Sequence, residues 1–240
     1  MANNILFVFE GEKTERQITK NLTQFFLNEN TIITCAYCST IYQVYKEISA
    51  DEDLDTFSLL KNRKQNEVIL EPYSTDDFAE IYMFFDYDGH DPIADDAKLK
   101  ELLTFFNEET DKGKLFISYP MIESLKHIED YNSFKDLKVG CKVNIYYKRL
   151  VSQTCLKGIY NLTTYTHEIW KKLIDAHLKK MNYVVNHAYA LPEDLISQLE
   201  IFEKQLEKYI EVDSTVGVLN SFPVFLHDYY GNEKLKGLIK

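Results

Sequence analysis

The sequence predicts an α/β fold: a parallel sheet with helices on both faces, followed by a mainly helical C-terminal region. Four runs are strand-like and almost entirely apolar: residues 4–10, 31–37, 80–88 and 114–119. Such runs are typical of parallel strands that are buried on both faces. Segments with helical periodicity alternate with them, which indicates βαβ units. The alternation stops near residue 132, so we expect a sheet domain over residues 1–131 and a second, partly basic region over 132–240.

The turn after the first strand predicts where the first helix begins. Gly11 frees this turn, and Thr14 and Gln17 fit a capping box, so a helix is expected from about Glu15. Further helices are expected over residues 39–49, 95–109, 120–130, 165–182 and 192–211. Pro120 would open the third of these, since proline is favoured in a first helical turn.

Two segments have a less regular pattern. Residues 50–78 are polar, and we expect irregular structure there. Residues 216–231 are apolar and aromatic, and we expect them either to dock on the core or to form a contact in a homodimer.

Composition excludes several classes of protein. No run of about 18 apolar residues is present, so no membrane span is expected. The N-terminal residues lack the basic region of a signal peptide, and four cysteines are too sparse for a disulfide framework. We therefore expect a cytoplasmic protein with reduced thiols. Cys35 and Cys38 have zinc-like spacing, but no second pair lies nearby, so structural cysteines are favoured.

Acidic side chains follow three of the predicted strands. Glu10 ends the first strand, Asp86 and Asp88 end the strand that reads IYMFFDYD, and Glu123 follows the strand over 114–119. The carboxyl ends of parallel strands meet at one edge of a sheet, where ligands bind. Carboxylate oxygens are the ligands that Mg²⁺ and Mn²⁺ prefer, so these acids, with Glu15 at the first helix, predict a metal site.

Each acid also has a purely structural interpretation. Glu15 would favour the dipole of its helix, Glu123 would be a solvated helical residue, and Asp86 and Asp88 would be turn formers. Glu10 is the hardest to explain in this way, because a carboxylate that ends an apolar strand needs a partner.

Two motifs in this segment resemble those of the Toprim family. FVFEGEKTE is similar to its first motif, a strand followed by Glu-Gly and a helix, and FFDYD is similar to its Asp-x-Asp motif. The form Glu-Gly-x-Lys-Thr-Glu is similar to Toprim-like proteins of bacterial phage-defence loci, the OLD-type nucleases and the RloB-like proteins. The resemblance covers residues 4–125 and does not extend to 132–240.

The resemblance implies a metal-dependent nuclease with a Toprim-like, Rossmann-like fold. Glu10, Asp86 and Asp88 would bind Mg²⁺ or Mn²⁺ and carry phosphodiester hydrolysis of DNA or RNA, with tRNA as one option. Glu15 would be an additional ligand, and Glu123 is a candidate for another. The resemblance also implies a separate ATPase partner of the ABC or SMC-like class, and a role as an antiviral effector that acts by abortive infection.

Basic residues suggest where a nucleic acid would bind. Residues 134–180 carry ten basic and three acidic side chains, although the whole chain has a formal charge of −11. Lys13 is a candidate contact to the scissile phosphate, with a solvated loop lysine as the alternative. The candidates for backbone contacts are Lys142, Lys148, Arg149, Lys171 and Lys172. Aromatic residues in the same segment are candidates for base stacking or for the core: Tyr146, Tyr147, Tyr160, Tyr165 and Trp170.

Three other functions compete with the nuclease. GEKT lacks the glycine spacing of a phosphate-binding loop and is rejected. A haloacid-dehalogenase-type phosphatase would use DYDG, but its motif normally lies on the first strand and it would leave Glu10 unexplained. A Toprim-like scaffold that binds a partner and cuts nothing has no need to bury three acids. Stabilisation by Mg²⁺ or Mn²⁺ would separate the scaffold from the nuclease.

Overall fold

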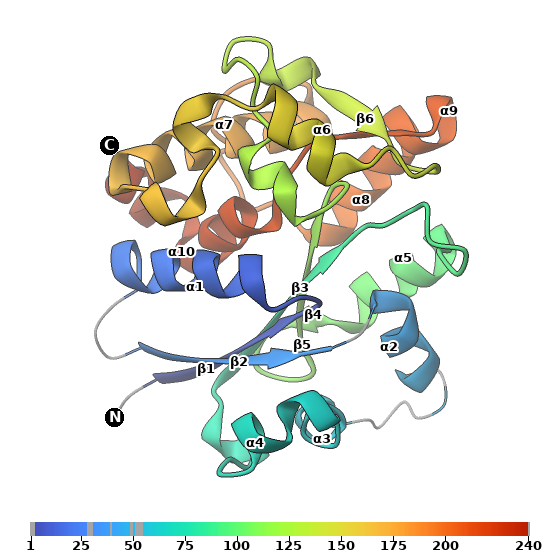
Figure 1. Ribbon diagram of the computed structural model, residues 1–240, viewed down its shortest axis with the longest axis vertical. Helices are drawn as coiled ribbons and strands as arrows, with labels where there is room; N and C mark the ends of the chain where they lie inside the picture. The colour runs from blue at the N-terminus through green and yellow to red at the C-terminus, as the bar shows by residue number, and fades with distance from the viewer. Residues whose placement is uncertain (1–2, 28–30, 39, 49, 51–54, 240) are drawn as a thin grey trace. The chain divides into compact units, whose positions relative to one another are not determined.

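The computed structural model describes residues 3–27, 31–38, 40–48, 50 and 55–239, and it contains a five-stranded mixed sheet (Figure 1). The strand order is β2-β1-β3-β5-β4. The strands are β1 (Asn3–Phe9), β2 (Thr31–Tyr37), β3 (Glu80–Asp86), β4 (Asn107–Glu108) and β5 (Gly113–Ser118). β1 is parallel to both β2 and β3, and β4 is antiparallel to β5. The predicted mostly parallel α/β sheet is therefore confirmed; the two-residue strand β4 was not predicted.

The chain divides into two compact units, and the first consists of Met1–Phe85 and Asp95–Leu115. Its helices are α1 (Lys13–Phe25), α2 (Ile41–Ile48), α3 (Thr56–Lys61), α4 (Glu67–Leu70) and α5 (Asp96–Phe105), with 3₁₀ helices η1 (Lys64–Asn66) and η2 (Thr75–Asp77). Figure 1 shows α1 on one side of β1 and β2, and α3 and α4 on the other. Residues 5–9 of β1 are almost completely buried, which explains their continuous apolar run.

Two predictions for this unit are wrong. The capping box does not form: α1 begins at Lys13 after Glu12, which makes no side-chain cap hydrogen bond, so Thr14 already lies inside the helix. Within the predicted irregular segment, residues 56–77 are largely short helices. Asn66 holds them to the sheet, because its buried amide accepts from Tyr37 N–H (2.7 Å) and donates to the carbonyls of Tyr37 and Leu60. Residues 51–54 lie outside the described residues.

The second unit consists of Asp86–Ala94 and Phe116–Lys240. Its elements are η3 (Ile122–Lys126), η4 (Phe134–Asp136), β6 (Lys138–Gly140), α6 (Tyr147–Thr154), η5 (Lys157–Ile159), η6 (Leu162–Thr164), α7 (His167–Asn186), α8 (Gln198–Gln205), the π-helical turn η7 (Leu206–Ile210), α9 (Glu211–Asp213), β7 (Thr215–Gly217) and α10 (Ser221–Ile239). β6 and β7 form an antiparallel ribbon. The predicted boundary after residue 131 falls inside this unit.

The core of the second unit lies between its long helices. α7 packs on α10, and Trp170 and Leu173 of α7 are fully buried. The apolar segment 216–231 forms β7 and the first part of α10, and its side chains up to His227 are buried, so within this unit it docks on the core. None of the helices among the described residues combines the length and apolar character that crossing a membrane requires.

Two predicted helices of this unit differ from the structure. Residues 120–130 contain only the 3₁₀ helix η3, because Tyr119 pairs with Leu219 and the Pro120 carbonyl accepts from Tyr87 N–H, which keeps the chain extended there. The helix predicted from residue 192 begins at Gln198. Ser197 and Glu200 form the capping box that sets this start.

Candidate metal centre and adjoining cavity

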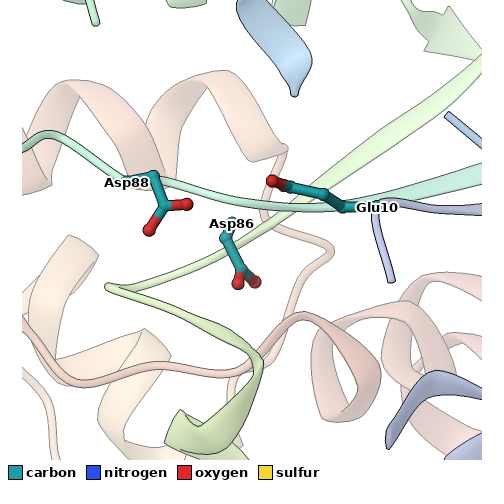
Figure 2. A group of neighbouring side chains, drawn as sticks. All are labelled: Glu10, Asp86 and Asp88. Atoms are coloured by element: carbon teal, nitrogen blue, oxygen red, sulfur yellow. The ribbon is translucent and has the colours of Figure 1, made fainter. Parts of the chain in front are cut away.

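Three carboxylates converge where β1 and β3 end. The two strands are parallel and in register, with Phe9 opposite Phe84, so Glu10 and Asp86 lie at the ends of neighbouring strands. Asp88 follows two residues later. Figure 2 shows the three side chains, and one oxygen from each lies within 4.8 Å of the others. All three side chains are half-buried. The structure therefore brings together the first three acids that the sequence predicted.

Asp88 is held in an unusual backbone conformation. Its φ is 40°, a left-handed conformation that aspartate tolerates better than most residues. Its N–H and that of Tyr87 donate to the Pro120 carbonyl, at 3.3 and 3.1 Å. Burial raises the pKa of Asp88, and Asp91 and Glu123 add to this, whereas His90 opposes it. The His90 Nδ1 lies 3.9 Å from Asp88 Oδ1, an atom that accepts no hydrogen bond within the described part of the chain.

The trio fits a bound cation. Three carboxylates within 4.8 Å repel one another, and a buried carboxylate oxygen without a hydrogen-bond donor is costly to desolvate. A cation between them would offset both costs. A set of oxygen donors alone suits a hard divalent ion such as Mg²⁺ or Mn²⁺ better than it suits Zn²⁺. The trio can therefore hold a metal ion.

Glu15 lies near this centre and outside the trio. Its Oε1 is 2.7 Å from the point that a Cβ on Gly11 would occupy, so the Glu15 side chain covers the backbone beside Glu10. A side chain on residue 11 would displace the end of the flexible Glu15 side chain. Lys13 is the exposed first residue of α1, and its predicted contact to a phosphate stays a prediction.

Glu123 is buried, contrary to the interpretation as a solvated helical residue. Its Oε1 lies 3.5 Å from Lys148 Nζ, and its Oε2 accepts no hydrogen bond among the described residues. The Asn220 side chain donates to the Ile122 carbonyl (3.0 Å) and to Ser124 Oγ (3.1 Å), and thereby fixes the backbone on both sides of Glu123. Glu123 acts electrostatically on Asp88, and it is not among the three ligands that converge.

Tyr147, a stacking or core candidate from the sequence, forms a buried pair with His127 beside the acids. Burial raises the pKa of Tyr147 well above its ordinary value, and the charges of Glu123 and Asp86 raise it further. The Tyr147 hydroxyl lies 2.9 Å from His127 Nδ1. Burial lowers the pKa of His127, so both groups are neutral at pH 7. The two residues are 20 positions apart, and no motif in the sequence indicates that they form a pair.

A cavity of about 320 Å³ adjoins Asp88 within the second unit. Asp88, Gly89 and His90 form one side of it. A Cβ on Gly89 would lie 2.5 Å from the Tyr87 ring and 3.0 Å from the Cys141 carbonyl oxygen, so only glycine fits this wall. The residues that line the rest of the cavity are Pro120, Met121, Gly140, Cys141, Val143, Asn144, Ile145, Tyr146, Tyr147, Lys148 and Arg149.

The predicted nucleic-acid contacts fall into separate places. Lys148 and Arg149 line the cavity, and the Lys142 ammonium lies 5.4 Å above the Tyr87 ring. Lys171 and Lys172 line a different hollow with Glu168 and Asp175. Lys180, which also belongs to the basic segment 134–180, is fully buried and donates to the carbonyls of Phe134 (2.8 Å) and Leu137. Its burial lowers its pKa. The basic segment is therefore not one continuous surface.

The aromatic residues divide in the same way. Tyr147, Tyr165 and Trp170 are buried, which excludes them as exposed stacking platforms. Tyr146 is 74% exposed and Tyr160 is 50% exposed. These two are the exposed members of the five candidates; Tyr146 lines the cavity, as the buried Tyr147 also does, and Tyr160 does not.

The four cysteines are all free thiols, so the Cys35–Cys38 spacing forms no disulfide. Comparisons of the chain with protein-family models, with curated proteins and with solved structures find no match.

Proposed function

We propose that the chain is a nuclease that depends on Mg²⁺ or Mn²⁺ and hydrolyses phosphodiester bonds. The observation that carries this proposal is the convergence of Glu10, Asp86 and Asp88 within 4.8 Å at the ends of β1 and β3. The Toprim-like motifs in the sequence support the same chemistry. They are also the basis for a role in phage defence and for a separate ABC-type ATPase partner.

Each group of the site has a role in this reaction. The three carboxylates would hold the cation, which when bound supplies a Lewis acid that acidifies water and neutralises phosphate charge. Lys148 and Arg149 offer charge to the non-bridging oxygens of the phosphate. Glu123 and the neutral hydroxyl of Tyr147 lie beside the acids and would order water there.

The reaction itself is a hydrolysis and needs no further reactant. The oxygen of water forms a bond to phosphorus while the bond from phosphorus to the leaving sugar oxygen breaks. One proton of the water goes to a carboxylate of the site or to solvent, and the leaving oxygen gains a proton. The products are a phosphate monoester and a hydroxyl group.

The position of Glu10 favours the nuclease over the two alternatives. A phosphatase that used Asp86 or Asp88 as its nucleophile would have no role for Glu10, yet its oxygen lies with theirs. In a scaffold without catalysis, the electrostatic repulsion among the three carboxylates would destabilise the fold and serve no function.

Cleavage assays with matched variants test the proposal. The purified chain, alone and with any ABC-type ATPase that is encoded beside it, is incubated with plasmid DNA and with total tRNA in Mn²⁺. We expect cleavage that EDTA abolishes, that Glu10→Gln loses and that Glu12→Gln keeps, since Glu12 is exposed at the start of α1. No cleavage of either substrate, together with no stabilisation by Mn²⁺, would contradict the nuclease and leave the scaffold.

A further inference from the structure

The cavity beside Asp88 combines two kinds of wall. Met121, Val143 and Ile145 provide apolar surface, and Tyr146 provides an aromatic ring at the rim. Val143 is 66% exposed and Tyr146 74% exposed, unusual values for large apolar side chains on one loop. Surface of this kind is retained where a ligand covers it. The apolar wall therefore suits a flat, partly apolar group.

Two basic side chains lie at the start of α6, beside the apolar wall of the cavity. Lys148 and Arg149 stand in the first turn of this helix, where positive side chains are unfavourable because the helix dipole is positive there. Arg149 is exposed and pairs with no carboxylate in the described part of the chain. The Lys148 ammonium lies 3.5 Å from Glu123 Oε1, but its side chain is 68% exposed, so both cations can face an anionic group bound at the cavity.

The volume of the cavity and its position beside Asp88 restrict the class of ligand that it can bind. A volume of about 320 Å³ lies at the small end of ligand sites, which span about 300–1,000 Å³. This volume has room for one nucleotide base. Asp88 belongs both to this cavity and to the acidic trio, so a ligand in the cavity lies beside the proposed reaction centre.

We propose that this cavity binds one unpaired nucleotide, with its base against Val143, Ile145 and Tyr146 and its phosphate toward Lys148 and Arg149. The inference rests on the proposed function and names its substrate: a single-stranded segment, or a nucleotide turned out of a helix. A base inside a duplex would have to leave its stack to enter. Recognition by stacking and charge tolerates many sequences.

Substitutions that fill the cavity test this assignment. Val143→Trp would occupy the apolar wall, and its matched control is Val212→Trp on α9, where the valine is equally exposed (69%) and lies outside the cavity. Arg149→Gln removes the cation, with Lys157→Gln as control. Binding of labelled single-stranded RNA and DNA 12-mers and of their duplexes is measured by fluorescence anisotropy in EDTA, with free nucleoside monophosphates as competitors.

We expect the chain to bind single strands more tightly than duplexes. Val143→Trp and Arg149→Gln should each weaken single-strand binding about tenfold or more, while both controls bind like the unmodified chain. Weak competition by free monophosphates would agree with a pocket for one nucleotide of a strand. Tight binding of a free monophosphate without binding of any strand would overturn the substrate assignment in favour of a small-molecule nucleotide ligand.

Equal binding by Val143→Trp and Val212→Trp would overturn the pocket itself. Because binding is measured without metal, this failure is separate from failure of the proposed hydrolysis. A chain that binds single strands through the cavity and cleaves nothing would refute the hydrolysis alone. A chain that cleaves nucleic acid but whose binding ignores Val143→Trp would refute the pocket alone.

Discussion

Phe9 lies directly opposite Phe84 in the parallel pairing of β1 with β3, and their stacked rings are 5.4 Å apart. This register fixes the ends of the two strands relative to each other. A shift by one residue would turn the side chains of a strand to the opposite face of the sheet. Glu10 directly follows Phe9 and Asp86 lies two residues after Phe84, so this register brings both acids to the same edge of the sheet, where they belong to the candidate metal centre.

Asp88 should destabilise the metal-free protein at neutral pH. Its raised pKa means that the folded state favours the protonated acid, so stability is lost as pH rises through that pKa and the cost is absent below the ordinary value of 3.8. Asp88→Asn also tolerates a φ of 40°. In EDTA at pH 7.5 we expect it to raise the melting temperature by about 2–4 °C, the change that about 1 kcal/mol produces in a chain of this size.

The higher melting temperature of Asp88→Asn should disappear in two conditions. At pH 4 the two proteins should melt closer together, and with Mn²⁺ at pH 7.5 the unmodified chain should become the more stable one. A variant that is less stable than the unmodified chain in EDTA at pH 7.5 would show that the Asp88 carboxylate is already compensated without metal.

Gly89 should be sensitive to the addition of a single methyl group. The new Cβ would lie 2.5 Å from the Tyr87 ring and 3.0 Å from a backbone oxygen of Cys141, and overpacking of this kind costs about 1–3 kcal/mol. We expect Gly89→Ala to lower the urea midpoint. The control is Gly158→Ala, where a Cβ meets nothing within 4 Å. Equal midpoints for the two variants would contradict the close packing of this wall.

His177 should make the protein sensitive to mild acid. Burial lowers its pKa to about 3, against 6.5 in the unfolded chain, and the nearby Lys180 adds to the effect. The unfolded state therefore takes up the proton first, and stability falls as pH drops below 6.5. Between pH 7.5 and 5 this one group should cost about 2 kcal/mol.

His177→Gln isolates this contribution. Glutamine can still donate to the Leu125 carbonyl, which lies 3.2 Å from His177 Nε2. The variant will be less stable at pH 7.5, but urea unfolding at pH 7.5 and pH 5 should show a smaller loss between the two values than in the unmodified chain. The same loss in both proteins would show that His177 is not the group that titrates.

The strands and the acidic trio were predictable because both depend on local pattern. Continuous apolar runs gave β1, β2, β3 and β5 within a residue or two, and their ends located Glu10, Asp86 and Asp88. Helix ends were less predictable, because contacts between distant residues decide them. The Tyr119–Leu219 pairing keeps residues 119–121 extended, and nothing near Pro120 in the sequence signals that pairing.

The surroundings of the site could not be predicted for the same reason. Asn220 fixes the backbone around Glu123 from almost a hundred residues away, and His127 meets Tyr147 only in the folded chain. Lys148 and Lys171 look alike in the sequence, yet they line different hollows. Charge counted along the chain does not specify which lysines share a surface.

Titration of the metal-free chain with Mn²⁺ by calorimetry measures whether Glu10, Asp86 and Asp88 bind a metal ion. We expect saturable binding, and we expect Glu10→Gln to weaken it at least tenfold while Glu12→Gln, two residues away and exposed, leaves it unchanged. Loss in the first variant alone would place the ion between β1 and β3. Binding that is equally strong in both variants, or no binding by the unmodified chain, would contradict a metal centre built on Glu10, Asp86 and Asp88.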